Sequence, residues 1–188
     1  NRQLAAREGP IASLIAETGG QNVMFVDSSA LPEQVALEAA YSAFNSAGQR
    51  CSALRVLLLQ QEIADRVIEL LRGYMQTLRV GDPALPETDV GPVIDAEALA
   101  MLRAHVERLA PAARWLQRSP LDAALAARGH FFAPVAMEIE SLELLQREVF
   151  GPVLHVVRYA SQDLDRVVDA VNGLGYGLTL GVQTRIDS

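Results

Sequence analysis

The sequence contains no lysine, because all 16 of its basic residues are arginine. Schiff-base chemistry and phosphate binding by a P-loop lysine both need the missing side chain, so these residues can perform neither. The three histidines, His105, His130 and His155, have no second ligand at the helical or loop spacing typical of metal sites. We therefore expect no bound metal.

Cysteine occurs once, at Cys51, which excludes an internal disulfide and a zinc knuckle. A lone thiol fits a reducing compartment, and we expect a cytoplasmic location. No apolar run approaches the roughly 20 residues that cross a bilayer, and no signal-peptide pattern begins the chain, so we expect no membrane span. The net charge of -7 argues against contact with nucleic acid or an anionic membrane surface.

Strand-like and helical stretches alternate from about residue 11, and most strand-like stretches are continuous apolar runs. This pattern predicts an α/β fold with a mostly parallel sheet and helices on both faces. Strands are expected at 11–17, 22–27, 54–60, 130–139, 149–160 and 176–184. Helices are expected at 1–8, 31–47, 62–78, 95–110 and 161–174, and a further helix between turns within 111–129. Pro32 suits a first helical turn, and Ser28, Ser29 and Ser161 are candidate helix caps.

Both ends lack the features of a complete domain. Asn1 is not a start methionine, the helix at 1–8 has no beginning, and the chain stops just after a strand-like run. We expect a piece of a larger protein, truncated at both ends.

Cys51 admits two interpretations. A free cysteine is most often a small buried hydrophobe. Here, however, Gly48 and Gln49 break the preceding helix, which lets backbone N–H groups turn toward an incoming oxygen. Arg50 and Arg55 add positive potential, which favours the thiolate. The local sequence leaves both a nucleophile and a core residue open.

A nucleophile also needs a base, and no histidine lies near Cys51 in the sequence. Glu17 ends an expected apolar strand and precedes Thr18, Gly19 and Gly20, where the backbone can approach a ligand closely. Partial desolvation at the edge of that strand would make the carboxylate a better general base. An ordinary exposed carboxylate in a turn is the alternative, and spacing alone does not decide.

Four stretches together resemble the aldehyde dehydrogenase superfamily. "ETGGQN" (17–22) is similar to its general-base motif, and "FNSAGQRCSA" (44–53) to its nucleophile motif. "EVFGPV" (148–153) is similar to its nicotinamide-ribose motif, and "NGLGYGLTLGVQT" (172–184) to its Asn and Tyr-Gly-Leu segment. They stand in the family's order, with spacings of 34 and 97 residues from Glu17 to Cys51 to Glu148.

The variant residues narrow the resemblance. Thr18 and Gln21 stand where general members carry Leu and Lys, and Ser52 directly follows the cysteine. The chain is most similar to L-glutamate γ-semialdehyde (Δ1-pyrroline-5-carboxylate) dehydrogenases, above all to the module of bacterial bifunctional proline-utilisation proteins. The resemblance implies that residues 1–17 are the tail of a dinucleotide-binding domain and that 18–188 form a catalytic domain, incomplete at its C-terminus. It also implies a homo-oligomer in the full protein.

The same resemblance implies the chemistry. Cys51 would attack an aldehyde substrate to give a thiohemiacetal and then a thioester, with NAD as the cofactor. Glu17 would activate the water that releases glutamate. FAD would belong only to a separate proline dehydrogenase domain.

The remaining site residues also follow from the resemblance. Glu148 would accept hydrogen bonds from the nicotinamide ribose, and Phe150 would pack beside the ring. Thr18 and Gly19 would bound the nicotinamide pocket. Ser52 would donate a hydrogen bond to the substrate carboxylate.

Two alternatives remain open at this point. A CoA-acylating aldehyde dehydrogenase would keep the cysteine but would not need a glutamate base, so Glu17 counts against it. The polypeptide as given is alternatively an inactive fragment, because the family's pyrophosphate-binding glycines and its oxyanion asparagine would lie upstream of Asn1. We expect the isolated fragment to show little or no NAD reduction.

Overall fold

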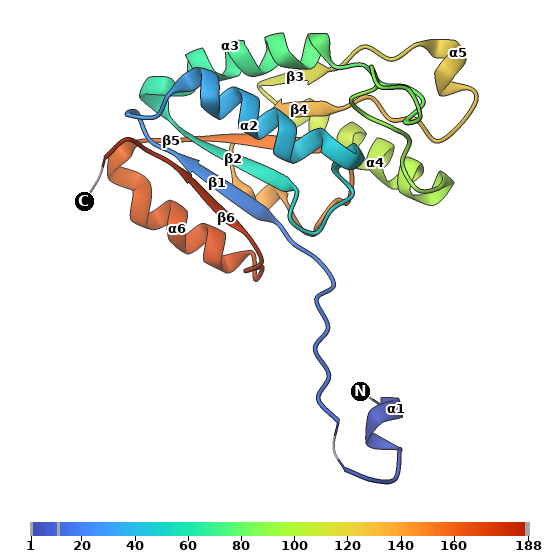
Figure 1. Ribbon diagram of the computed structural model, residues 1–188. Helices are drawn as coiled ribbons and strands as arrows, with labels where there is room; N and C mark the ends of the chain where they lie inside the picture. Colours follow the sequence, from blue (N-terminus) through green and yellow to red (C-terminus); the bar gives the residue numbers. More distant parts are fainter. Residues whose placement is uncertain (1, 11, 187–188) are drawn as a thin grey trace.

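The computed structural model describes residues 2–10 and 12–186, and a six-stranded sheet in the order β3-β4-β5-β2-β1-β6 forms its centre (Figure 1). Every neighbouring pair is parallel except β3 and β4. The predicted, mostly parallel sheet is confirmed. The strands are β1 (Asn22–Val26), β2 (Leu54–Gln60), β3 (Trp115–Arg118), β4 (Val135–Glu138), β5 (Val153–Tyr159) and β6 (Leu180–Gln183).

Helices cover both faces of the sheet. On β5, His155 contacts His105 of one helix, whereas Arg158 forms an ion pair with Asp65 of another. Positions 155 and 158 point to opposite faces of a strand, so the two helices lie on opposite sides. The α-helices are α1 (Arg2–Ala5), α2 (Pro32–Phe44), α3 (Gln61–Thr77), α4 (Ala96–Leu109), α5 (Ala123–Ala126) and α6 (Leu164–Gly173). Short 3-10 turns are η1 (Asn45–Gly48), η2 (Ala110–Ala112), η3 (Leu142–Leu144) and η4 (Ser161–Asp163).

The core is built around β2. Its residues Val56–Leu59 pair with Val23–Val26 of β1 on one side and with 155–158 of β5 on the other. A central parallel strand is covered on both faces, which explains the continuous apolar run Val56–Leu59. One member of β2 departs from this composition, since Arg55 is only 1% exposed.

The expected strand at 11–17 is wrong. Residues 12–17 form no strand and all are exposed, and Ile11 lies outside the described residues. Figure 1 shows this segment running away from the sheet toward α1. An apolar run forms a strand only where another strand offers backbone partners, and the described chain places none beside it.

The three serine caps are also wrong. The cap of α2 is Leu31, without a side-chain hydrogen bond, although Pro32 does lie in the first turn as expected. Ser29 instead donates from its N–H and its hydroxyl to Asp27, which keeps it in the preceding turn. The Ser161 hydroxyl donates to Gln162, and the cap of α6 is Asp163.

Region 111–129 holds more than the expected helix. It contains β3 as well as the short α5, and β3 pairs with β4 in antiparallel register. The sequence of β3 is Trp-Leu-Gln-Arg, which is neither alternating nor continuously apolar, so its pattern gave no strand signal.

Candidate active site

The four motif segments meet at one edge of the sheet. Residues 17–21 lead into β1, 48–53 into β2, 148–152 into β5, and Tyr176 precedes β6. These strands are neighbours in the order β5-β2-β1-β6 and run parallel, so their amino ends share an edge. The fold therefore brings together segments that are far apart in the sequence.

The cysteine turn, residues 45–53, follows a helix that ends earlier than expected. The α2 helix stops at Phe44 rather than continuing to 47. Ser46, Ala47 and Gly48 then have φ values of 57°, 52° and 62°, the left-handed region that side chains other than glycine disfavour. A Cβ on Gly48 would lie 2.3 Å from the Gly151 carbonyl oxygen, so only glycine fits there.

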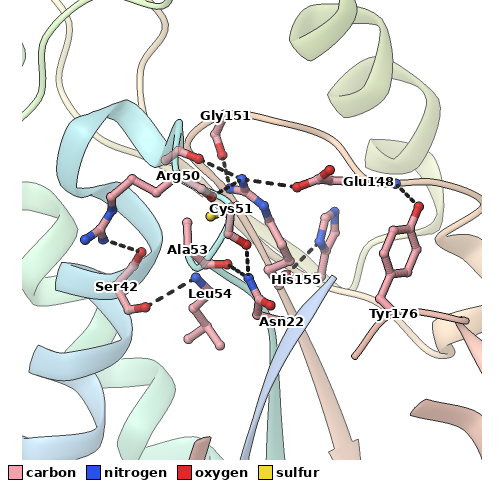
Figure 2. A network of polar contacts seen from close by, with 12 residues as sticks. Asn22, Ser42, Arg50, Cys51, Ala53, Leu54, Glu148, Gly151, His155 and Tyr176 are labelled. Carbon is pink, nitrogen blue, oxygen red and sulfur yellow. Dashed lines mark hydrogen bonds and ion pairs between the residues drawn. The ribbon is translucent and has the colours of Figure 1, made fainter. Parts of the chain in front are cut away.

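Asn22 holds the cysteine turn from β1. Its buried side-chain amide donates to the carbonyl of Cys51 at 2.7 Å and to that of Ala53 at 2.8 Å (Figure 2). A Cβ on Gly20 would lie 2.7 Å from the Cys51 oxygen, which shows how closely the two segments approach. Sequence reasoning missed this role, and its one signal was the place of Asn22 at the end of the "ETGGQN" stretch.

Cys51 itself is exposed at the tip of this turn. Its backbone N–H makes no hydrogen bond within residues 2–10 and 12–186. Exposure does not fit the interpretation of Cys51 as a buried core residue. Ser52, directly beside it, is exposed as well.

Glu148 lies between two other parts of the site. Its N–H donates to the Tyr176 hydroxyl at 3.3 Å (Figure 2). Its carboxylate oxygen Oε1 lies 3.7 Å from an Arg55 nitrogen. The side chain is 13% exposed, and in the part of the chain that the structure describes Oε1 is buried without a hydrogen-bond partner. A Cβ on Gly19 would lie 2.6 Å from the second oxygen, Oε2. Phe150 is exposed, and the Arg55 guanidinium lies 5.4 Å from its ring centroid.

A cavity of about 460 Å³ joins several of these positions. Its lining includes the predicted residues Glu17, Thr18, Gly19 and Glu148, together with Tyr176. Cys51, Ser52 and Phe150 are not part of that lining. Glu17 is exposed, so the partial desolvation expected from the sequence is wrong for this structure. A larger cavity of about 630 Å³ lies between η3, β5 and α6 and holds none of the predicted site residues.

Membership of a known family explains why the four motif segments meet at one edge of the sheet. The sequence profile of the aldehyde dehydrogenase family matches residues 2–187. The chain belongs to the aldehyde dehydrogenase family. The resemblance inferred from the four motifs is thereby confirmed.

Within the aldehyde dehydrogenase family, the chain is 50% identical over 193 residues to the bifunctional protein PutA of Klebsiella aerogenes. That match covers 99% of this chain and 15% of the relative, so the chain spans a small part of that protein's length. A crystal structure of bifunctional proline utilization A (PutA) superposes with a TM-score of 0.92 at 52% identity, covering 100% of this chain and 18% of that one. The predicted aldehyde dehydrogenase-like fold is confirmed.

A second structure bears on the cofactor. The 1-pyrroline-5-carboxylate dehydrogenase from Thermus with bound NAD superposes with a TM-score of 0.78 at 32% identity. It covers 90% of this chain and 32% of that one. Among the residues placed by the structure, no helix is long and apolar enough to cross a membrane, and no group of three or more metal-ligating side chains is present.

Proposed function

We propose that the complete protein carrying this chain oxidises L-glutamate γ-semialdehyde to L-glutamate with NAD, the second step of proline catabolism. The observation that carries the proposal is the meeting of the four motif segments at one sheet edge, with Cys51 exposed there. The names of the relatives, PutA and 1-pyrroline-5-carboxylate dehydrogenase, support this substrate.

Cys51 is the proposed nucleophile. Its thiolate attacks the aldehyde carbon, and the carbonyl π pair moves to oxygen as the C–S bond of a thiohemiacetal forms. The Cys51 N–H is free to donate a hydrogen bond to that oxygen. Loss of one such donor typically raises the barrier by about 3 to 4 kcal/mol. Ser52, adjacent and exposed, is the proposed donor to the substrate carboxylate.

The residues around Glu148 fit NAD. Glu148 Oε1, which has no hydrogen-bond partner among the described residues, is an acceptor suited to ribose hydroxyls, and Thr18 and Gly19 line the same cavity. The exposed Phe150 ring is available to pack beside the nicotinamide. NAD, when bound, supplies the acceptor for the hydride of the aldehyde carbon.

Glu17 is the proposed base for the second half of the reaction. It takes a proton from water, whose oxygen attacks the thioester carbon, and the C–S bond breaks to return the Cys51 thiolate and release glutamate. Its place in the cavity that Glu148 also lines supports this role.

The wider organisation of the protein is also a proposal. The exposed segment at 12–18, which runs between α1 and β1, supports a boundary near residue 17 between a dinucleotide-binding domain and the catalytic domain. We further propose a homo-oligomeric, cytoplasmic protein whose segment here contacts no nucleic acid. We also propose a separate, FAD-dependent proline dehydrogenase domain, and the word bifunctional in the name of the PutA relative supports a second activity in the complete protein.

NADH formation by the complete protein tests this function. We expect wild type to form NADH from L-glutamate γ-semialdehyde without CoA and Cys51→Ala to form none, whereas Ser161→Ala, at an exposed position on another part of the fold, matches wild type. A strict requirement for CoA would favour the CoA-acylating alternative. Normal turnover by Cys51→Ala would contradict the proposal.

A further inference from the structure

We propose that Arg55 is a positioning residue that fixes the cysteine turn against the ribose loop, residues 148–152, and thereby aligns Cys51 with bound NAD. The inference rests on the proposed function, because it assigns Cys51 and Glu148 their roles there. Neither the motif resemblance nor the charge pattern assigned Arg55 more than a contribution to local potential.

Arg55 is a buried cation in the core. It is 1% exposed, in a strand whose neighbours are leucine and valine, and arginine is rarely buried so fully without partners. Burial lowers its pKa to about 10, against the opposing attraction of Glu148, so the guanidinium is still protonated at neutral pH. A buried charge of this kind persists where the surrounding groups compensate for lost water.

Its partners belong to the two segments that must be aligned. One guanidinium nitrogen donates to the Gly151 carbonyl at 2.7 Å, and the other donates to the Gly48 carbonyl at 2.7 Å and to the Arg50 carbonyl at 3.3 Å. Gly48 and Gly151 are far apart in sequence but touch in space. The planar fork of a guanidinium holds both carbonyls at once with donors in fixed directions, whereas the donors of a lysine ammonium rotate about a single compact nitrogen.

Arg55 also lies close to the Glu148 carboxylate but does not donate a hydrogen bond to its oxygen Oε1. The distance of 3.7 Å from the Arg55 nitrogen to Oε1 is beyond a good hydrogen bond, yet short enough for attraction between opposite charges. With no hydrogen bond to Oε1 from residues 2–10 or 12–186, its lone pairs are open to a ligand. The centre of the same guanidinium lies 5.4 Å from the Phe150 ring centroid, within the range of a cation–π interaction, so Arg55 interacts with both Glu148 and Phe150.

The backbone of Arg55 is held as firmly as its side chain. The Arg55 carbonyl lies 3.0 Å from His155 Nδ1, and His155 Nε2 lies 2.8 Å from His105 Nε2. With both rings neutral, Arg108 donates to His105, His105 donates to His155, and His155 donates to the Arg55 carbonyl, at distances that satisfy each link. Arg55 thus has a fixed position from which to set the two segments.

Two substitutions in the complete protein test the role. Arg55→Met removes the charge and the fork, and Arg55→Lys keeps the charge but replaces the planar fork with a compact ammonium group. Arg66→Met is the matched control, because Arg66 is exposed and forms only surface ion pairs. The readouts are the NAD dissociation constant, the rate of Cys51 alkylation by iodoacetamide, and the KM values for NAD and aldehyde.

We expect Arg55→Met to weaken NAD binding and to slow alkylation, each by about tenfold or more, since several hydrogen bonds to a charged group are lost. Arg55→Lys recovers part of both, and the KM for NAD rises more than the KM for aldehyde. Arg66→Met leaves all readouts unchanged. Wild-type NAD affinity and alkylation in Arg55→Lys would overturn the proposal.

A double-mutant cycle separates positioning from simple stabilisation. If Arg55 acts on NAD through Glu148, Arg55→Lys weakens NAD binding much less in a Glu148→Gln background than in wild type. If the losses of NAD affinity in the two single variants simply add in the double variant, the positioning role is wrong. Should Arg55→Met fail to fold, Arg55→Lys still provides this test. A wild-type protein that binds no NAD and oxidises no aldehyde contradicts the proposed function instead, and the alkylation rates then still decide whether Arg55 sets the cysteine turn.

Discussion

At the scale of single residues, the cysteine turn depends on hydrogen bonds to its carbonyl groups. Asn22 supplies both hydrogens of its amide to Cys51 and Ala53. Arg55 supplies the donors for Gly48 and Arg50. Three consecutive left-handed residues make this turn unfavourable on its own, so these donors maintain a shape that the local sequence does not prefer.

Asn22→Leu is expected to destabilise the fold and to slow Cys51 alkylation. It leaves two carbonyls without their donor, which lowers the free energy of unfolding by about 1 to 3 kcal/mol. Gln34→Leu is the control, because its amide donates only to Glu38 on the exposed face of α2. Urea denaturation of both variants measures the difference. Wild-type stability in Asn22→Leu would show that the amide does not hold the turn.

Motif residues were predictable from the sequence, whereas their supports were not. Glu17, Cys51 and Glu148 stand in stretches whose order and spacing indicate a family. The amide of Asn22 and the fork of Arg55 act on backbone carbonyls whose directions depend on the left-handed turn at 46–48. No local sequence pattern predicts that turn, because two of its three residues are Ser and Ala, which rarely adopt positive φ values.

At the scale of elements, α4 and β5 are joined by a buried pair of histidines. Burial, reinforced by the positive charges of Arg108 and Arg147, lowers the pKa of His105. Burial also lowers the pKa of His155, with His105 and Arg55 adding to the effect. Both rings stay neutral in the fold, as the hydrogen-bond chain through them requires.

The buried His105–His155 pair makes the free energy of unfolding depend on pH. The unfolded histidines protonate near pH 6.5 and the folded ones only at lower pH, so below that value the unfolded state binds more protons. Stability from the pair is fully present above pH 6.5 and is lost as the pH falls toward about 4.

The double variant His105→Gln and His155→Asn tests this dependence. Its amides can donate as the rings do but do not titrate, so the unfolding midpoint should fall less steeply with decreasing pH than in wild type. His130→Gln, at an exposed histidine, should keep the wild-type slope. Equal slopes in the double variant and wild type would contradict the assigned protonation.

Strand prediction succeeded or failed for a physical reason. The runs at 54–60 and 149–160 are mostly apolar because β2 and β5 are covered on both faces, and the sequence shows this directly. The run ending at Glu17 is also apolar, yet the described part of it has no neighbouring strand and forms none. A pattern of apolar residues reports burial but cannot report the partner that a strand requires.

At the scale of the whole molecule, Cys51 and residues 12–18 are exposed to solvent. Apolar side chains on β6 are also open to solvent, with Leu180 62% and Val182 61% exposed. Glu17 lies on the exposed segment, and its own side chain has no hydrogen bond or ion pair to the cysteine turn among the interactions of the described residues. The proposed nucleophile Cys51 and the proposed base Glu17 thus lie at the same edge of the sheet, but no interaction among the described residues joins the Glu17 side chain to the cysteine turn.

The isolated 188-residue polypeptide should accordingly form little or no NADH from L-glutamate γ-semialdehyde, while the complete protein forms it readily under the same conditions. An assay of both at equal concentration checks this. Robust turnover by the isolated polypeptide would show that these 188 residues contain every group that catalysis needs, and would contradict this prediction.

In the proposed mechanism, Cys51 carries the acyl group and Glu17 releases it. Stopped-flow measurement of NADH formation in the complete protein separates these two roles, with Glu87→Gln as a control at an exposed carboxylate. We expect Glu17→Gln to keep the first-turnover burst but lose steady-state turnover, Cys51→Ala to show neither, and Glu87→Gln to behave as wild type. A burst of wild-type size in Cys51→Ala, or normal steady-state turnover in Glu17→Gln, would contradict it.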